Sequence, residues 1–325
     1  MAGEASSGLE ARPFEDGDRE AWDRLVEESR SCHFLFRRDY MEYHRDRFED
    51  ASLVVVDGDA PVALLPASRD GAVVVSHGGL TFGGLISSPR LTTRRTVEAL
   101  EAVLDRLRRD GAGSLTYKAV PAIYHRVPAE EDLYALFLAG AALVRRDCSA
   151  ALRPASRLPY TKGRRTAVRQ GKGAGLAVSR DDAFAEFMAL EADALARRHK
   201  VTPVHTPEEM QRLAARFPDN IKLFTARRGG ELLGGVIVYE TPMVAHAQYI
   251  AGSESGYSEH ALDAVVDFLI SEEYAAKPWF DFGISTTEEG RVLNEGLIRN
   301  KESFGARAIV HDVYRVELGA RDEMG

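Results

Sequence analysis

The sequence predicts an α/β protein built of two tandem units, each a mixed central sheet flanked by helices. The chain has 325 residues, which is more than one typical domain needs. Predicted strands and helices also follow the same order twice: strand, helices, three-stranded meander, helix, strand, helix, strand. A repeated order predicts a duplicated unit. We place the boundary between residues 1–155 and 156–325, and expect the two central strands of each sheet to be parallel and joined through a helix.

In the first half, alternating apolar residues and turn signals predict strands at 9–14, 52–56, 61–67, 72–76, 114–120 and 142–152. Helical spacing predicts helices from Asp18, around 38–48, and at 93–109 and 131–138. Trp22, Leu25 and Val26 would form the buried face of the first helix. The Asp57-Gly58-Asp59 run predicts a hairpin turn between two of the strands.

The second half repeats the pattern. Strands are predicted at 176–178, 222–226, 232–239, 244–250, 279–283 and 308–317, and helices at 183–198, after Thr206, and at 259–272 and 292–301. Thr206-Pro207-Glu208-Glu209 is a helix start: a capping threonine, proline at the first position and acids in the first turn.

Composition limits the class of protein. The net charge of -8 argues against a protein that coats nucleic acid non-specifically. No apolar run is long enough to span a bilayer, and the polar start of the chain has no secretory pattern. The cysteines, Cys32 and Cys148, form neither a metal cluster nor a disulfide framework. We therefore expect a cytoplasmic protein without membrane insertion and without a bound metal.

One segment is strongly basic. From Arg145 to Lys172 nine basic residues face one acid, Asp147. Such a patch could meet a tRNA backbone, a polyphosphate or an acidic carrier protein. A solvated linker helix is the equally open alternative. As donor-docking candidates we take four cations of this segment, namely Arg164, Arg165, Arg169 and Lys172.

Three stretches carry a family resemblance. They are His246-Ala247-Gln248-Tyr249-Ile250-Ala251, Phe280-Asp281-Phe282-Gly283-Ile284-Ser285 and the run from Leu293 to Ala306, in which Lys301 precedes Phe304-Gly305. With the element order, they resemble the GNAT acyltransferase fold, and the duplication resembles the Fem family of aminoacyl-tRNA-dependent peptidyltransferases. The resemblance implies two GNAT-like units, the first on the acceptor side and non-catalytic, the second carrying the catalytic cleft.

The resemblance also implies a role for Lys301. In Fem-like enzymes the matching lysine is implicated in stabilising charge during acyl transfer, as a cation near an oxyanion. A lysine in the last turn of a helix can also simply satisfy the helix C-terminus. Asn294 and Glu302, in the same motif, are taken as substrate-binding residues.

The predicted strands 244–250 and 279–283 supply further candidates. Strand alternation places His246 and Gln248 on one face and Tyr249 on the other. Gln248 could orient a substrate amide, and Tyr249 could protonate the leaving group, unless either is a core residue. Asp281, between two aromatics, could accept the amine proton or form a buried structural pair.

Histidines complete the set. His77 begins a glycine-rich segment and is a catalytic candidate, while His199 and His205 bracket a loop that could clamp the acceptor. Each could equally be a structural histidine.

Two features depart from familiar patterns. The run Gly252–Ser258 follows the third meander strand, where CoA-dependent GNAT enzymes hold pyrophosphate, but it lacks the basic residue and contains Glu254. Gln170-Gly171-Lys172-Gly173-Ala174-Gly175 matches the pyrophosphate pattern, yet it precedes a strand instead of following one. The coiled-coil arm of typical Fem enzymes is also missing.

These observations predict an enzyme that forms an amide by direct attack of a small amine on an activated acyl or aminoacyl group, in natural-product or cell-envelope biosynthesis. We expect no tightly bound cofactor. The donor would be a thioester on an acyl carrier protein or CoA, or an aminoacyl-tRNA. Two alternatives stay open: an ordinary acetyl-CoA-dependent N-acetyltransferase, and a catalytically dead GNAT binding module.

Overall fold

The computed structural model describes residues 8–199 and 203–319, except for the side chains of residues 198 and 199. The chain divides into two compact units: unit 1 comprises Met1–Asp147 and Val310–Gly325, and unit 2 comprises Cys148–Ile309. The chain enters unit 2 within β9 (Ala142–Leu152) and returns to unit 1 within β17 (Arg307–Glu317). This division differs from the predicted split after residue 155, because the last strand pairs antiparallel with β8 of unit 1, from Val313↔Lys118 to Glu317↔Ser114.

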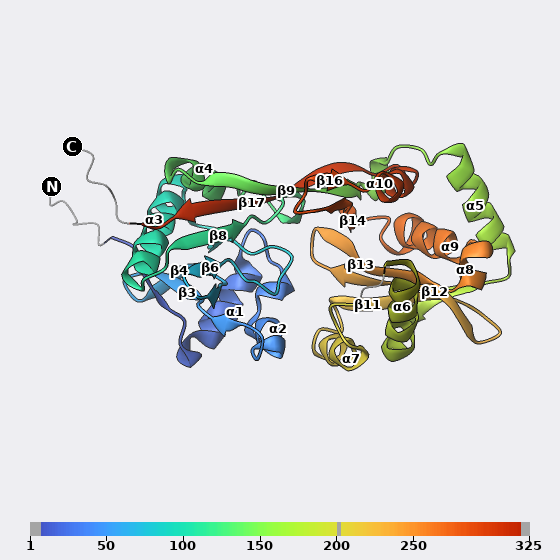
Figure 1. Ribbon diagram of the computed structural model, residues 1–325, viewed down its shortest axis with the longest axis horizontal. Helices are drawn as coiled ribbons and strands as arrows, with labels where there is room; N and C mark the ends of the chain where they lie inside the picture. The colour runs from blue at the N-terminus through green and yellow to red at the C-terminus, as the bar shows by residue number, and fades with distance from the viewer. Residues whose placement is uncertain (1–7, 200–202, 320–325) are drawn as a thin grey trace. The chain divides into compact units, whose positions relative to one another are not determined.

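Unit 1 contains two groups of strands (Figure 1). One sheet has the order β1-β3-β4-β7, with β1 at Glu10–Pro13, β3 at Leu53–Asp57, β4 at Ala60–Leu65 and β7 at Ile86–Ser87. The other group has the order β17-β8-β6-β5-β2, with β8 at Ser114–Lys118, β6 at Val73–Val75, β5 at Ser68–Asp70 and β2 at Glu49–Asp50. β6 and β8 are parallel, and the other pairs of this unit are antiparallel.

Helix α3 (Thr93–Arg109) provides the main helical cover of the unit 1 core. Thr92 caps it by accepting a hydrogen bond from the Arg95 amide, and Leu100, Val103 and Leu107 lie on its buried face, as the sequence spacing predicts. The remaining helices of the unit are short: α1 (Arg19–Glu28), α2 (Arg38–Met41), α4 (Glu131–Leu138) and the 3₁₀ turns Asp16–Asp18, Phe34–Phe36, Glu42–His44 and Ala122–Tyr124.

Unit 2 has the strand order β10-β11-β12-β13-β14-β9. The strands are β10 (Ala177–Asp181), β11 (Ile221–Arg228), β12 (Glu231–Glu240), β13 (Val244–Gly252) and β14 (Trp279–Ile284). Only β13 and β14 are parallel, and α8 (Glu254–Ser258), α9 (Ala261–Phe268) and a π-helical turn (Leu269–Glu273) connect them. This confirms the predicted pair of central parallel strands joined through a helix.

Helices cover both faces of this sheet. Val265 and Val266 of α9 belong to the core cluster that contains Val236 and Val238, whereas Phe187 of α6 (Phe184–His199) lies against Gly235 on the other face. The other helices are α5 (Lys162–Gly173), α7 (Pro207–Arg216) and α10 (Glu295–Glu302), with a 3₁₀ turn at Pro154–Ser156 and a small hairpin of β15 (Thr286–Thr287) and β16 (Val292–Leu293). No helix in the described residues is long and apolar enough to cross a membrane.

Strands β13 and β14 separate after a short contact. They pair only at Val244↔Trp279, Ala245↔Phe280 and His246↔Asp281, so the second half of β13 has no partner on that side. At this point of β13 a bulge shifts the pairing with β12. Ile237 pairs with Tyr249, but the next residue, Val238, pairs with Ala247. Gln248 is the extra residue of the bulge.

The bulge corrects one expectation from the sequence. Tyr239 pairs with His246 and Ile237 with Tyr249, and residues 237 and 239 share a face of β12. His246 and Tyr249 therefore share one face of β13, because the bulge reverses the alternation that the sequence predicted.

Candidate active site

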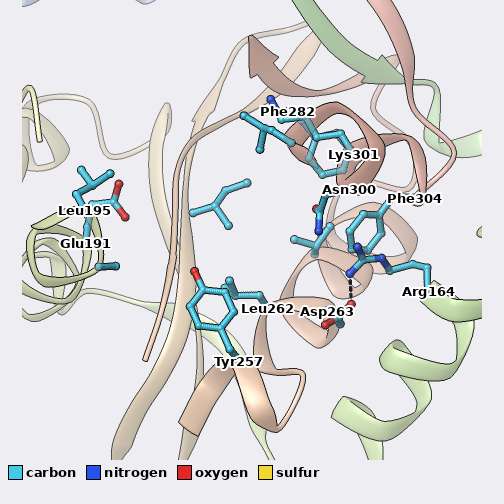
Figure 2. A pocket seen from close by; sticks show the side chains of 14 residues that line it. Arg164, Glu191, Leu195, Tyr257, Leu262, Asp263, Phe282, Asn300, Lys301 and Phe304 are labelled. Carbon is cyan, nitrogen blue, oxygen red and sulfur yellow. Dashed lines mark hydrogen bonds and ion pairs between the residues drawn. The ribbon is translucent and has the colours of Figure 1, made fainter. Parts of the chain in front are cut away.

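A cavity of about 320 Å³ opens in unit 2 where β13 and β14 separate (Figure 2). Apolar side chains from β13, β14 and α9 form most of its wall, including Ile250, Leu262, Val266 and Phe282, and Phe304 follows α10. The polar side chains on its wall are Arg164, Glu191, Tyr257, Asp263, Asn300 and Lys301. A largely apolar cavity with a few polar groups is the usual form of a small-molecule site.

Lys301 lies at the edge of this cavity and is only 4% exposed. Its Nζ donates hydrogen bonds to the carbonyl oxygens of Gly283 and Ile284, both at 2.7 Å. Burial lowers the pKa of Lys301 to about 8, so the ammonium form still predominates at pH 7. An ammonium group has three N–H donors, and two carbonyls leave one N–H for a ligand.

The local sequence fixes this lysine. Asn294 caps α10 by accepting a hydrogen bond from the Leu297 amide at 3.0 Å, and Gly305 follows the end of the helix at φ +88°. A Cβ at residue 305 would lie 2.2 Å from the Leu158 carbonyl oxygen, so only glycine fits there. The predicted substrate-binding residue Asn294 is thus an exposed helix cap in the structure.

Asp281 lies behind Lys301 and is fully buried. It accepts hydrogen bonds from Ser149 Oγ at 2.8 Å and from the Gly283 amide at 3.1 Å, and His246 Nδ1 lies 2.8 Å from its other oxygen. A carboxylate without exposed surface does not reach a substrate. It holds the Gly283 turn, at φ +77°, whose carbonyl binds Lys301. Asp281 therefore supports the backbone whose carbonyls bind Lys301.

Glu191 of α6 is a candidate that the sequence analysis missed. It is 7% exposed, points into the cavity in Figure 2, and has no hydrogen-bond partner among the described residues. Burial raises the pKa of Glu191 to about 7. A signal was present: Phe184, Phe187, Met188 and Ala194 form the buried face of this helix, and Glu191 lies on it at helical spacing. An acid within an apolar helix face is costly unless it is used.

The structure also brings two predicted residues together. Tyr249 Oη lies 2.6 Å from His205 Nδ1, and both side chains are buried. Gln248 is half-buried at the bulge, and Glu302 lines a second, open hollow of unit 2 beside α5 and α10. His199 lies outside the residues whose side chains the structure describes. His77 belongs to unit 1.

The basic segment begins in β9 and ends in α5, which holds all four predicted docking cations, and two of these four are engaged within unit 2. Arg164 pairs with Asp263, donates to Ser303 at 2.9 Å and lies over the Phe304 ring. Lys172 pairs with Asp267 at 2.7 Å. Asp263 and Asp267 both belong to α9, so these pairs attach α5 to α9. Arg165 and Arg169 are exposed, and Arg165 donates to the Tyr160 carbonyl at 2.7 Å.

The start of the α8–α9 segment is the position at which the sequence analysis looked for a pyrophosphate site. The Ser253 side chain already accepts the Gly256 amide at 3.0 Å, and a Cβ at residue 256 would lie 1.9 Å from the Leu233 carbonyl oxygen. At α9, Asp263 occupies the first turn, and Gly171 of α5 packs directly against the His260 carbonyl. Glu254 adds a carboxylate to the first turn of α8, whereas Asp263 is paired with Arg164.

Comparison with known proteins identifies the fold. Residues 157–289 match the family model described as an acetyltransferase (GNAT) domain. The structure is similar to that of FemX, with a TM-score of 0.64 at 11% identity over 95% of this chain and 97% of that one. It is also similar to L-PGS from Bacillus licheniformis, with a TM-score of 0.62 at 13% identity over 96% and 94% of the two chains. No curated protein sequence gives a significant match. The chain therefore has the GNAT fold, and residues 157–289 are the part of it that matches the GNAT domain model.

Proposed function

We propose that the chain is an acyltransferase that moves an activated acyl or aminoacyl group onto an amine in the cavity of unit 2. The observation that carries this proposal is that two groups line the same largely apolar cavity: Lys301, with two of its three N–H donors bonded, and Glu191, without a hydrogen-bond partner among the described residues. The GNAT domain match over residues 157–289 supports it.

Each group has a step to perform. The amine attacks as the free base, and a carboxylate with a pKa of about 7 accepts the proton that the nitrogen loses as the N–C bond forms. The new N–C bond turns the carbonyl oxygen into an oxyanion, which the free N–H of Lys301 stabilises in a cavity of low dielectric. Collapse breaks the bond between the acyl carbon and the thiol or ribose oxygen of the donor. Protonated Glu191 then returns its proton to the leaving group.

We infer that the donor is bound through a macromolecular carrier, either an acyl carrier protein thioester or an aminoacyl-tRNA. The closed α8–α9 start disfavours CoA held by its pyrophosphate, and exposed Arg165 and Arg169 could meet the anionic surface of a carrier. The Fem-type motif around Lys301 and the similarity to FemX support the same class. A cytoplasmic role in natural-product or cell-envelope biosynthesis fits such a donor.

Amide formation tests the proposal directly. Purified protein is incubated with an amine panel and with acetyl-CoA, acylated carrier protein or charged tRNA, and products are measured by mass spectrometry. With the active donor, Glu191→Gln should lower kcat by about 10² to 10⁴ and Lys301→Met by about 10² to 10³. Glu295→Gln is the control, because Glu295 is 80% exposed on the same helix as Lys301.

The outcomes separate the alternatives. Full turnover by both cavity variants would refute the proposed site. Turnover with acetyl-CoA alone would support the ordinary N-acetyltransferase instead, and would contradict the fit argument for the α8–α9 start. Carrier binding without any product, unaffected by either variant, would indicate the binding module.

A further inference from the structure

Unit 1 contains a cavity of its own, of about 450 Å³. Its walls come from the segments around α1, α2, β2 and β5, and from His77 two residues after β6. The lining residues are Asp16, Arg19, Arg38, Met41, Glu42, Arg45, Phe48, Asp50, Ala67, Ser68 and His77. Its volume is within the range of small-molecule sites, and nothing in the proposed acyl transfer uses it.

His77 is the unusual residue of this cavity. It is 4% exposed, and its Nδ1 is buried without a hydrogen-bond partner among the described residues. Its backbone has φ +63°, which is rare outside glycine and is often found at functional sites. Burial lowers the pKa of His77 to about 3, with the neighbouring His44 acting in the same direction. The imidazole is therefore neutral at physiological pH and suits a partner that is itself neutral, such as a hydroxyl group.

The charged groups beside His77 form a fixed and balanced network. Arg38 donates to Glu42 at 3.0 Å and also binds Asp50, while Arg19 donates to Glu42. Burial alone would raise the pKa of Asp50, but hydrogen bonds from Arg38 outweigh it and lower the pKa, so the carboxylate stays ionised. The lining as a whole contains three guanidinium groups and three carboxylates. Because the charges balance, this cavity attracts neither a polyanion nor a polycation.

Two further features limit the chemical class of ligand that this cavity could bind. Asp16 and Arg45 are exposed and have no ion-pair partner among the described residues, so both can bond to a ligand at the opening. Phe48 offers a half-buried ring 4.9 Å from the His44 ring and 6.2 Å from the His77 ring, measured between centroids. The Phe48 ring lies beside guanidinium donors and carboxylate acceptors. This combination suits a ligand ring that presents C–H groups on its face and hydroxyl groups around its edge.

We propose that the His77 cavity of unit 1 binds a sugar of hexose size through its hydroxyl groups. Carboxylate and carbonyl oxygens accept from the hydroxyls, guanidinium groups donate to them, and neutral His77 can do either. The proposal stands on unit 1 alone and does not depend on acyl transfer in unit 2.

The test uses the full chain and defined probes. Saturation-transfer NMR and calorimetry at pH 7.5 measure binding of D-glucose, D-glucosamine and N-acetyl-D-glucosamine, with inorganic phosphate and UDP as anionic probes. His77→Asn keeps a residue that tolerates the left-handed backbone but removes the ring, and Arg45→Ala changes an exposed side chain. We expect His77→Asn to raise Kd on the order of tenfold and Arg45→Ala to raise it several-fold. His260→Asn, at φ +58° in unit 2, is the matched control and should leave Kd unchanged.

Three results would overturn the proposal. One is the absence of binding for every sugar at millimolar concentration. Another is sugar binding that neither His77→Asn nor Arg45→Ala weakens while both variants remain folded, since the sugar would then bind elsewhere. The third is binding of phosphate or UDP, but of no sugar, with sensitivity to these variants, which would identify an anion site.

Discussion

Replacing Glu191 by glutamine should make unit 2 more stable while it lowers kcat. Glutamine keeps the shape of the side chain but cannot ionise. The pKa of Glu191 is raised from 4.5 to about 7 in the folded protein, so the native state holds this proton more tightly than the unfolded chain does. The free energy of unfolding contributed by Glu191 is therefore fully present below pH 4.5 and is lost as the pH rises to about 7.

The size of this effect follows from the same two pKa values. At 1.36 kcal/mol for each pH unit between them, the ionised carboxylate lowers the stability of unit 2 by on the order of 3 kcal/mol. Wild type and Glu191→Gln should therefore have similar stability near pH 4.5. Above pH 7.5 the variant should be more stable by roughly that amount.

Urea unfolding at a series of pH values measures this difference without any knowledge of the substrates. The two units need not unfold together, so each must be followed separately. The sequence has two tryptophans, Trp22 in unit 1 and Trp279 in unit 2. In a Trp22→Phe background, fluorescence therefore reports unit 2 alone, and Glu295→Gln serves as the exposed control.

A stability difference that does not change between pH 5 and pH 8 would refute the reasoning. So would a variant that is less stable than wild type at pH 8, because Glu191 would then be a favourably bound anion.

Three further predictions concern the chemistry and architecture of unit 2. The pH profile of kcat/KM should be bell-shaped, falling below about 7 as Glu191 gains a proton and above about 8 as Lys301 loses one; an acidic limb that persists in Glu191→Gln with residual activity would contradict the assignment. Gly305→Ala should lower the free energy of unfolding, measured in urea, by at least about 2 kcal/mol, because residue 305 has a left-handed backbone and its Cβ would meet the Leu158 carbonyl. Gly173→Ala is the control and should not destabilise unit 2, because the space around Gly173 is open. Asp281→Asn should lower kcat with little change in KM, because it loosens the Gly283 turn that holds Lys301; an unchanged kcat would show that Asp281 has no positioning role.

The spacing of apolar and turn residues in the sequence was sufficient to predict most of the helices and strands. Helix 93–109 and strand 142–152 have in the structure the bounds that periodicity predicted. The parallel pair β13–β14 also followed, since an amphipathic helix between two apolar strands favours a crossover. Lys301 was found because a family motif surrounds it, and the structure places it on the cavity wall.

The features that the sequence analysis predicted wrongly depend on neighbours that are distant in the chain. Alternation predicted opposite faces for His246 and Tyr249, but the bulge against β12 puts them on the same face. Net charge along the segment made Arg164 and Lys172 look available, whereas Asp263 and Asp267 of α9 neutralise them. Each outcome was decided by a partner roughly a hundred residues away or on another strand.

The sequence by itself thus determined the order of the elements, the duplicated α/β plan and the motif around Lys301, because these depend on spacing within a few turns of chain. Only the tertiary structure decided that the last strand completes the sheet of unit 1, that Asp281 is enclosed, and that Glu191 faces a cavity without a partner among the described residues. The physical reason is that strand pairing, desolvation and side-chain pKa depend on the groups that surround a residue in space. Many of these groups are distant in the sequence, so local spacing does not predict them.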